Sequence, residues 1–119
     1  MPARNFKEIL KDKMDTYVHL ISKKFPRVEQ YGVTSQIRRA ALSVILNYVE
    51  GYARRRPAVQ LNFLEISYGS LKESEYLLRF CEAEGFINKD DCASISKVAN
   101  EIGAMLWTEI HALEKSLKS

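Results

Sequence analysis

The chain has 119 residues, 46% hydrophobic and 28% charged, which predicts a single globular domain over residues 1–119 and excludes a disordered chain. Residues 1–60 hold 12 Lys/Arg and 5 Asp/Glu (+7), residues 61–119 hold 6 and 10 (−4), and the net charge is +3. This asymmetry indicates either a basic surface for an anionic partner or halves that attract each other, within the fold or between subunits.

The first predicted helix covers Asn5–Lys24, where apolar residues recur at helical spacing between lysines. It ends at Phe25, because the residue before a proline is disfavoured in the α conformation. A loop over residues 27–32 follows. The apolar residues of this helix are Phe6, Ile9, Leu10, Met14, Tyr17 and Ile21.

The second predicted helix runs from Gln36 to about Arg55, and Thr34 or Ser35 is expected to cap its first turn. Its polar residues fall on one narrow stripe, and nearly all others are apolar. Such a helix is buried on more than one side, whereas a bundle monomer covers about half of it. We therefore expect subunit contacts, since large exposed apolar patches are rare on monomers. The stripe comprises Gln36, Arg39, Ser43, Asn47, Glu50 and Arg54.

The third predicted helix opens with Pro57 at its first position and continues to about Glu84. Gly69 lies in its middle, where glycine is unfavourable, so we expect a close helix–helix approach there. Gly85 is expected to end the third helix by adopting a left-handed backbone conformation. Asn88 is expected to cap a fourth helix that reaches the C-terminus. Because all connections are short, the fold class is all-α, an up-and-down antiparallel four-helix bundle.

The sequence gives no support for an enzyme, a metal site or a cofactor. His19 and His111 belong to no ligand pattern, and there is no phosphate-binding loop, dinucleotide fingerprint or nucleophile elbow. Cys81 and Cys92 are interpreted as reduced helix residues, with a redox role as the alternative. The N-terminus lacks a signal-peptide pattern and no apolar run approaches the ~20 residues that span a bilayer, so we expect a cytoplasmic protein with no membrane segment.

Several polar residues interrupt the apolar surfaces of the second and third helices. Buried polar groups must be paired, so these residues predict a structural network between the two helices that sets register and partner. A ligand-binding site is the alternative. Gly51, which follows Glu50 in the sequence, is expected at a close contact between helices, where a larger side chain does not fit. The residues are Arg38, Asn47 and Glu50 in the second helix, and Glu73 and Glu75 in the third.

A basic cluster offers the clearest candidate binding site. Arg54, Arg55 and Arg56 are consecutive at a helix end, which is typical of phosphate contacts and would make binding salt-dependent. Lysines of the first helix extend this candidate nucleic-acid surface, although a solvated face is their usual interpretation. They are Lys7, Lys11 and Lys13.

Three segments resemble a known bacterial family. They are Tyr31-Gly32-Val33-Thr34-Ser35-Gln36-Ile37-Arg38-Arg39-Ala40-Ala41 with Asn47-Tyr48-Val49-Glu50-Gly51-Tyr52, then Gly69-Ser70-Leu71-Lys72-Glu73, and Gly85-Phe86-Ile87. They are similar to four-helix-bundle proteins first found encoded in intervening sequences of 23S ribosomal RNA genes. The resemblance implies a four-helix bundle, and some relatives assemble as homopentamers. Another protein similar to this family, the accessory variability determinant of diversity-generating retroelements, binds a reverse transcriptase and nucleic acid through basic surfaces.

Together these observations favour a non-enzymatic homo-oligomer, preferably a pentamer, that binds RNA, DNA or a nucleic-acid enzyme through its basic residues. The alternative is a protein-interaction scaffold without a nucleic-acid role, in which the basic and acidic halves complement each other between subunits.

Overall fold

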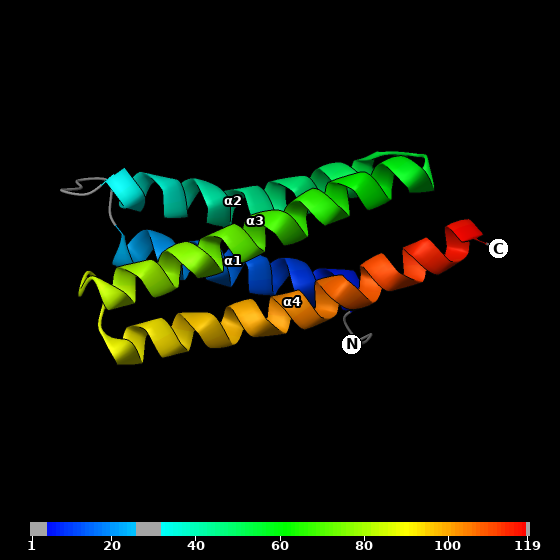
Figure 1. The fold of residues 1–119 in the computed structure, drawn as a ribbon. Helices are drawn as coiled ribbons and strands as arrows, with labels where there is room; N and C mark the ends of the chain where they lie inside the picture. Colours follow the sequence, from blue (N-terminus) through cyan, green and yellow to red (C-terminus); the bar gives the residue numbers. More distant parts are fainter. Residues whose placement is uncertain (1–4, 26–31, 119) are drawn as a thin grey trace.

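Four antiparallel α-helices form the described part of the chain, residues 5–25 and 32–118 of the computed structural model (Figure 1). Each helix packs against its neighbours in sequence, and α1 also packs against α4, so the four lie around one core. The prediction of an all-α, up-and-down four-helix bundle is confirmed. Of the predicted loop at 27–32, residues 27–31 lie outside the described residues, and Gly32 is the first residue of α2 and not part of a loop. The helices are α1 (Phe6–Lys24), α2 (Gly32–Ala53), α3 (Pro57–Ala83) and α4 (Lys89–Lys118).

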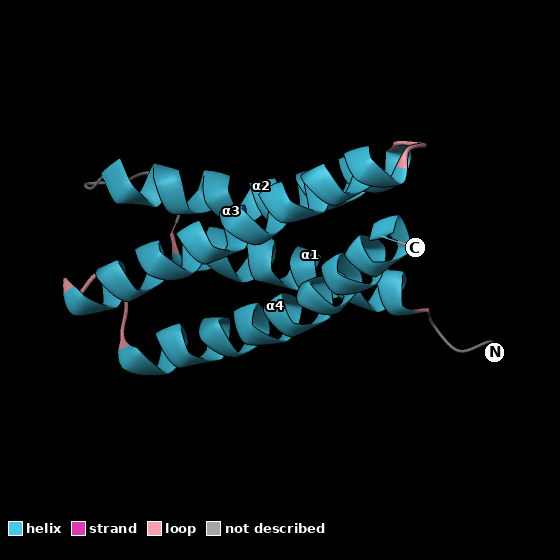
Figure 2. Ribbon diagram, turned by 45° about the vertical axis from the view of Figure 1, so that its right-hand side comes forward, coloured by secondary structure: helices cyan, strands magenta, loops and turns pink. Residues whose placement is uncertain are grey.

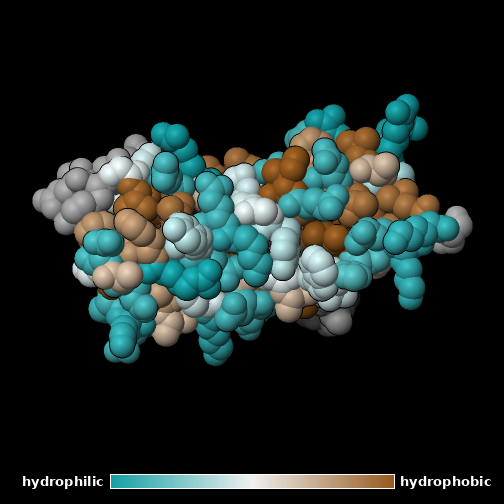
Figure 3. All heavy atoms as spheres, in the orientation of Figure 1, coloured by the Kyte–Doolittle hydropathy of each residue, from teal (hydrophilic) through white to brown (hydrophobic). Residues whose placement is uncertain are grey.

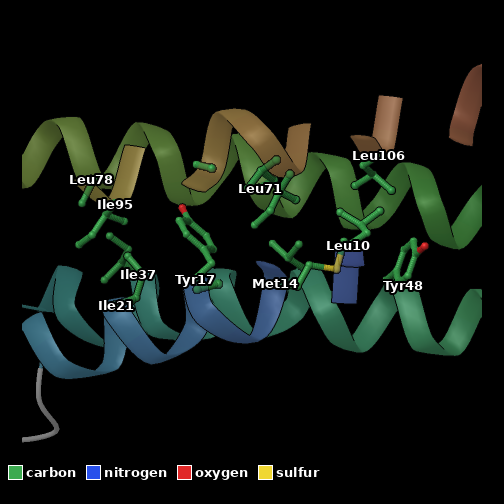
Figure 4. Close-up of a cluster of buried hydrophobic side chains, with 14 of the residues drawn as sticks. Leu10, Met14, Tyr17, Ile21, Ile37, Tyr48, Leu71, Leu78, Ile95 and Leu106 are labelled. Atoms are coloured by element: carbon green, nitrogen blue, oxygen red, sulfur yellow. The ribbon is translucent and has the colours of Figure 1, made fainter. Parts of the chain in front are cut away.

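The core consists of one buried stripe from each helix (Figure 4). On α1, Leu10, Met14, Tyr17 and Ile21 are completely buried, and their spacing of three or four residues keeps them on one face. Burying a large apolar side chain contributes about 1.5–3 kcal/mol, so these stripes supply the main driving force for assembling the bundle. The largest buried side chains of the other helices are Ile37, Tyr48, Leu64, Leu71, Leu78, Ile95, Ile102 and Leu106.

Helices α2 and α3 approach each other closely because small residues line their contact. The Ser67 hydroxyl donates to the carbonyl oxygen of Val44 at 2.6 Å, and the hydroxyls of Ser43 and Ser70 lie 2.9 Å apart. Since Ser67 is fully buried, its bond to the α2 backbone satisfies a hydroxyl that would otherwise be costly to bury.

Gly51 and Gly69 are both expected at close contacts between helices, and only Gly51 lies at such a contact. A Cβ atom on Gly51 would lie 3.1 Å from Phe63 Cβ and 3.3 Å from the Gln60 carbonyl oxygen, so the expected close contact is confirmed. Gly69 is exposed, and a Cβ added there meets no described atom within 4 Å. The expectation of a close approach at Gly69 is therefore wrong within the monomer.

Local signals account for most helix ends, but the start of α2 differs from the prediction. The Asn88 side chain accepts a bond from the Asp91 amide at 2.8 Å and so caps α4 as expected. Helix α2 begins at Gly32 instead of Gln36, so neither Thr34 nor Ser35 is its cap. Thr34 is buried at the start of the α2 core stripe, and packing of this first turn extends the helix beyond the capping signal.

The end of α3 has the hydrogen bonds of a glycine stop. Gly85 has a φ of +79°, its amide donates to Glu82 O at 3.0 Å, and the amide of Phe86 donates to Cys81 O at 2.8 Å. This pattern satisfies carbonyl groups that the helix leaves unpaired, and it turns the chain toward α4.

Candidate nucleic-acid interface

The three consecutive arginines form the connection between α2 and α3, which we call the arginine turn (Arg54, Arg55 and Arg56). Arg56 has an extended conformation at the N-cap of α3, and Pro57 occupies the first helical turn as predicted. The Gln60 side-chain amide donates to the Arg54 carbonyl oxygen at 2.7 Å. The backbone of the turn is therefore held between two helix ends, while all three arginine side chains are exposed.

The three arginines differ in their partners. The Arg54 guanidinium donates to the Glu50 carboxylate one helical turn earlier and lies 5.2 Å from the Phe63 ring centroid. Within the described residues, Arg55 and Arg56 form no ion pair. A phosphate would thus compete with Glu50 for Arg54 but with no carboxylate for the other two.

The three candidate lysines of α1 do not lie on one surface. Lys7 and Lys11 are exposed one turn apart, and the Lys7 ammonium lies 4.3 Å from the Tyr52 ring centroid near the arginine turn. Lys13 lies on another face, where its ammonium is 3.5 Å from the Glu101 carboxylate of α4. The structure thus groups Lys7 and Lys11 with the end of the bundle, whereas Lys13 belongs to the α1–α4 contact.

Several basic residues lie on segments that meet at one end of the bundle, the end that holds the C-terminus (Figure 2). The start of α1, the arginine turn and the end of α4 lie at this end, and a shallow depression between them is lined by Lys7, Gln60 and Ser116. The last turn of α4 adds Lys115 and Lys118. These two lysines were not among the sequence candidates, because only the antiparallel packing brings the C-terminus to the arginine turn.

The predicted polar network does not form as one cluster. The Asn47 amide donates to the carbonyl oxygen and hydroxyl of Ser43 on its own helix, and the link to α3 is the contact between the hydroxyls of Ser43 and Ser70 instead of an Arg–Glu or Asn–Glu pair. Glu50 pairs with Arg54 of its own helix. Arg38 is half-buried beside the α1–α2 groove, and its Nε atom is buried without a hydrogen-bond partner in the described chain.

Only one of the two α3 glutamates predicted for the network is buried. Glu73 is exposed, whereas Glu75 is only 8% exposed. Two residues along a helix rotate the side chain by about 200°, so only one of this pair can face the bundle. Glu75 Oε1 lies 3.4 Å from the Lys72 ammonium, without a geometrically proper hydrogen bond.

A half-buried carboxylate at the basic end was missed by sequence reasoning. Tyr48 and Tyr52 of α2 both donate hydrogen bonds to the carboxylate of Glu109 on α4. Burial raises the pKa of Glu109, and the Tyr48 hydrogen bond and the Lys7 charge oppose that shift. Two tyrosines one turn apart are the only local signal of this cluster, because its acceptor lies on a helix remote in sequence.

A second buried tyrosine pairs with a serine in the core. Tyr17 Oη lies 2.6 Å from Ser74 Oγ, and that serine donates its single proton to the Leu71 carbonyl oxygen at 2.8 Å. Tyr17 is therefore the donor of the pair. Burial raises the pKa of Tyr17 to about 12, so the phenol is neutral and able to donate at ordinary pH.

Apolar surface remains uncovered on α2, as the surplus of apolar residues predicts. Leu42, Leu46 and Val49 are 45%, 56% and 47% exposed at a spacing of four and three residues, which makes them one outward stripe. Neighbouring α3 exposes Val59 and Ile66. Figure 3 shows apolar atoms gathered in patches between hydrophilic side chains on one face of the molecule.

No metal or redox site emerges from residues 5–25 and 32–118. No group of three or more His, Cys, Asp or Glu side chains in this part of the chain has a geometry that could hold a metal ion. Cys81 and Cys92 are free and buried on α3 and α4, and burial raises the pKa of both thiols. No helix in the described segments is long and apolar enough to cross a membrane.

The fold and its exposed surfaces define an all-α four-helix-bundle protein. Residues 10–108 match the family model of the 23S rRNA-intervening sequence proteins, and the chain belongs to this family, which confirms the resemblance. A crystal structure of a protein with unknown function from the S23 ribosomal protein family of Bacteroides thetaiotaomicron has the same fold, with a TM-score of 0.80. It is 24% identical, and the match covers 85% of this chain and 97% of that chain. Among curated proteins, none matches this chain.

Proposed function

We propose that this protein is a non-enzymatic homo-oligomer that binds structured RNA or DNA, or a nucleic-acid enzyme, through the basic end of its bundle. The observation that carries the proposal is the arginine turn, whose three side chains are exposed on a backbone held between two helix ends. Arginine binds phosphate with two parallel hydrogen bonds, and a fixed backbone limits the entropy lost when it does so.

The surrounding charges support an anionic partner. Lys7, Lys11 and the last-turn lysines of α4 surround the same end, where Glu50 is paired with Arg54 and Glu109 accepts from Tyr48 and Tyr52. Glu8 in the first turn of α1 and Glu114 beside Lys115 and Lys118 reduce the positive charge of this end, and the arginine turn carries most of what remains. Lys13 is not part of the proposed surface, because it pairs with Glu101.

Self-association is supported by the exposed stripe of Leu42, Leu46 and Val49. In a monomer these side chains would leave apolar surface in water, and at about 25 cal/mol per Å² their burial between subunits favours association. A pentamer is the assembly that the family resemblance implies. In a ring of subunits the arginine turn is repeated, and several weak phosphate contacts then act together.

The nucleic-acid test compares two triple variants that lose the same charge. Binding of a fluorescent RNA hairpin is followed by anisotropy over a series of salt concentrations. Alanine at all three positions of the arginine turn should weaken binding and reduce the slope of log K against log salt by about 2 to 2.7, from about 0.7–0.9 per phosphate contact. The control replaces exposed lysines at the opposite end of the bundle. They are Lys23, Lys89 and Lys97.

The control variant should retain the parent affinity and slope. Equal losses in the two triple variants would mean that net charge alone governs binding, and they would overturn the assignment to the arginine turn. An unchanged slope in the arginine variant would also overturn it.

The oligomer test uses Leu46→Glu, with Leu117→Glu as control. Leu46 is 56% exposed and Leu117 is 43% exposed, so neither substitution opens the core of the monomer. Light scattering after size exclusion should give a smaller mass for Leu46→Glu and the parent mass for the control. A parent of monomer mass, or an assembly unaffected by Leu46→Glu, contradicts the proposal that this stripe is a subunit contact.

The apolar stripe of α2 also favours the second candidate function, a protein-interaction scaffold without a nucleic-acid role. In that case the basic and acidic halves of the chain attract each other between subunits. The parent oligomer would then not bind the RNA hairpin at any salt concentration, and weaker association at high salt would report the attraction between the two halves, which adds to the salt-insensitive apolar contact.

A further inference from the structure

A row of aromatic rings lies across the outer surface of the α3–α4 contact. The ring centroids of Tyr68 on α3 and Trp107 on α4 are 5.4 Å apart, and those of Trp107 and His111 are 4.5 Å apart. Trp107 is nevertheless 49% exposed, so these contacts position the indole without covering it. Two neighbours restrain its orientation, so a ligand that stacks on it loses little side-chain entropy.

The exposed indole lines a recess of about 250 Å³. Gly103 and Ala104 are too small to fill the space beside the ring, and Asn100 and Lys72 border it. The Asn100 amide offers both a donor and an acceptor. The Lys72 ammonium lies 5.2 Å from the Tyr68 ring centroid and 3.4 Å from Glu75, and its side chain remains 53% exposed.

This combination fits a flat, polar-edged ligand better than an apolar peptide. The face of the indole can stack on another aromatic ring. The amide beside it can form hydrogen bonds with the edge of that ring, and an ammonium at the rim can contact a phosphate. An unpaired nucleobase carries all three complementary features, whereas a base inside a duplex cannot present its face. The recess lies across the α3–α4 contact, and the apolar stripe lies on α2.

We propose that the recess at Trp107 binds one unpaired nucleobase of a nucleic-acid strand, stacked on the indole with Asn100 at its edge and Lys72 near its phosphate. This inference rests on the proposed nucleic-acid function and adds to it. The arginine turn would bind phosphates without regard to base pairing, and Trp107 would select strands with unstacked bases, such as loops and ends.

The chain contains a single tryptophan, so its fluorescence reports on this recess alone. The probes are single-stranded oligoadenylate as RNA and as DNA, a blunt RNA duplex of equal length, and inorganic polyphosphate. Stacking of adenine on the indole should quench emission with oligoadenylate, and the duplex and polyphosphate should leave it unchanged. Equal quenching by RNA and DNA indicates recognition of the base alone, and stronger quenching by RNA indicates an added contact to the 2′-hydroxyl.

Trp107→Ala should lower the affinity for oligoadenylate by about 5- to 100-fold, the range expected for one base–aromatic stack. Its salt slope should not change, because no phosphate contact is removed. Trp107→Phe should retain part of the affinity, since a smaller ring still stacks. The matched control is Tyr76→Ala, which removes a more exposed aromatic ring, 64% exposed, from α3. This control should bind like the parent.

Failure of this inference can be separated from failure of the proposed function. If oligoadenylate binds with dependence on the arginine turn but neither quenches Trp107 nor responds to Trp107→Ala, the recess is not a base site and the proposed function stands. If neither these probes nor the RNA hairpin binds, the base site and the direct binding of nucleic acid are both overturned. A smaller mass of Trp107→Ala in light scattering would show that the indole is a subunit contact, which also overturns the base site.

Discussion

Replacing Gly51, in the last turn of α2, and Gly69, in the middle of α3, by alanine tests the two glycines expected at helix contacts. Alanine is favoured over glycine in a helix interior by about 1 kcal/mol, and this gain applies in full at Gly69 and is smaller in the last turn at Gly51. At Gly51 the new methyl group would meet Phe63 Cβ at 3.1 Å and the Gln60 carbonyl oxygen at 3.3 Å, neither of which can rotate away. Forcing a methyl group into such a contact costs about 1–3 kcal/mol.

Gly69→Ala should raise the free energy of unfolding by about 1 kcal/mol. Gly51→Ala should lie about 1–3 kcal/mol below it, mainly because of the steric cost at Phe63 and Gln60. The measurement is urea unfolding followed by circular dichroism, at several protein concentrations because subunit association adds to stability.

Equal stability of the two variants would refute the close α2–α3 contact at Gly51. A loss of stability in Gly69→Ala that grows with protein concentration would instead place Gly69 against another subunit. The monomer surface around Gly69 would then be an interface that the isolated chain leaves open.

Two further predictions concern the buried tyrosines. Ser74→Ala should lower the free energy of unfolding by about 1–3 kcal/mol, because Tyr17 loses its acceptor. Adding Tyr17→Phe should remove part of that cost. If the losses of the two single variants in urea unfolding simply add in the double variant, the pairing is contradicted. For Glu109, the raised pKa in the folded state means that its contribution to stability is present below its ordinary pKa of 4.5 and is lost as pH rises through the folded-state pKa. Glu109→Gln keeps a partner for Tyr48 and Tyr52, so its stability relative to the parent should increase from about pH 4 to 7; a difference that is constant with pH would contradict the shift.

Local interactions explain why so much of this fold can be predicted from the sequence. Periodic apolar residues, the Asn88 cap, the Gly85 stop and Pro57 each act within one or two helical turns, and the structure places them as expected. The start of α2 is the exception. The exposure of the arginine turn is also local, because a short connection between antiparallel helices lies at the end of a bundle.

The choice among similar residues on one helix depended on tertiary packing. Glu73 and Glu75 both interrupt apolar positions, and only the packing of the other helices around α3 determines that Glu75 is buried. Lys13 resembles Lys7 in sequence, but its pairing with Glu101 requires the contact between α1 and α4.

Tertiary packing also assembled the polar and aromatic sites. Glu109 meets Tyr48 and Tyr52, and Trp107 meets Tyr68, only after separate helices dock. The sequence by itself determined the helices, most of their ends and their buried faces, because short-range backbone and side-chain energies specify these. Only the tertiary structure decided which polar residues are paired and which aromatic surfaces stay open, because those depend on the rotation of each helix about its axis relative to its neighbours.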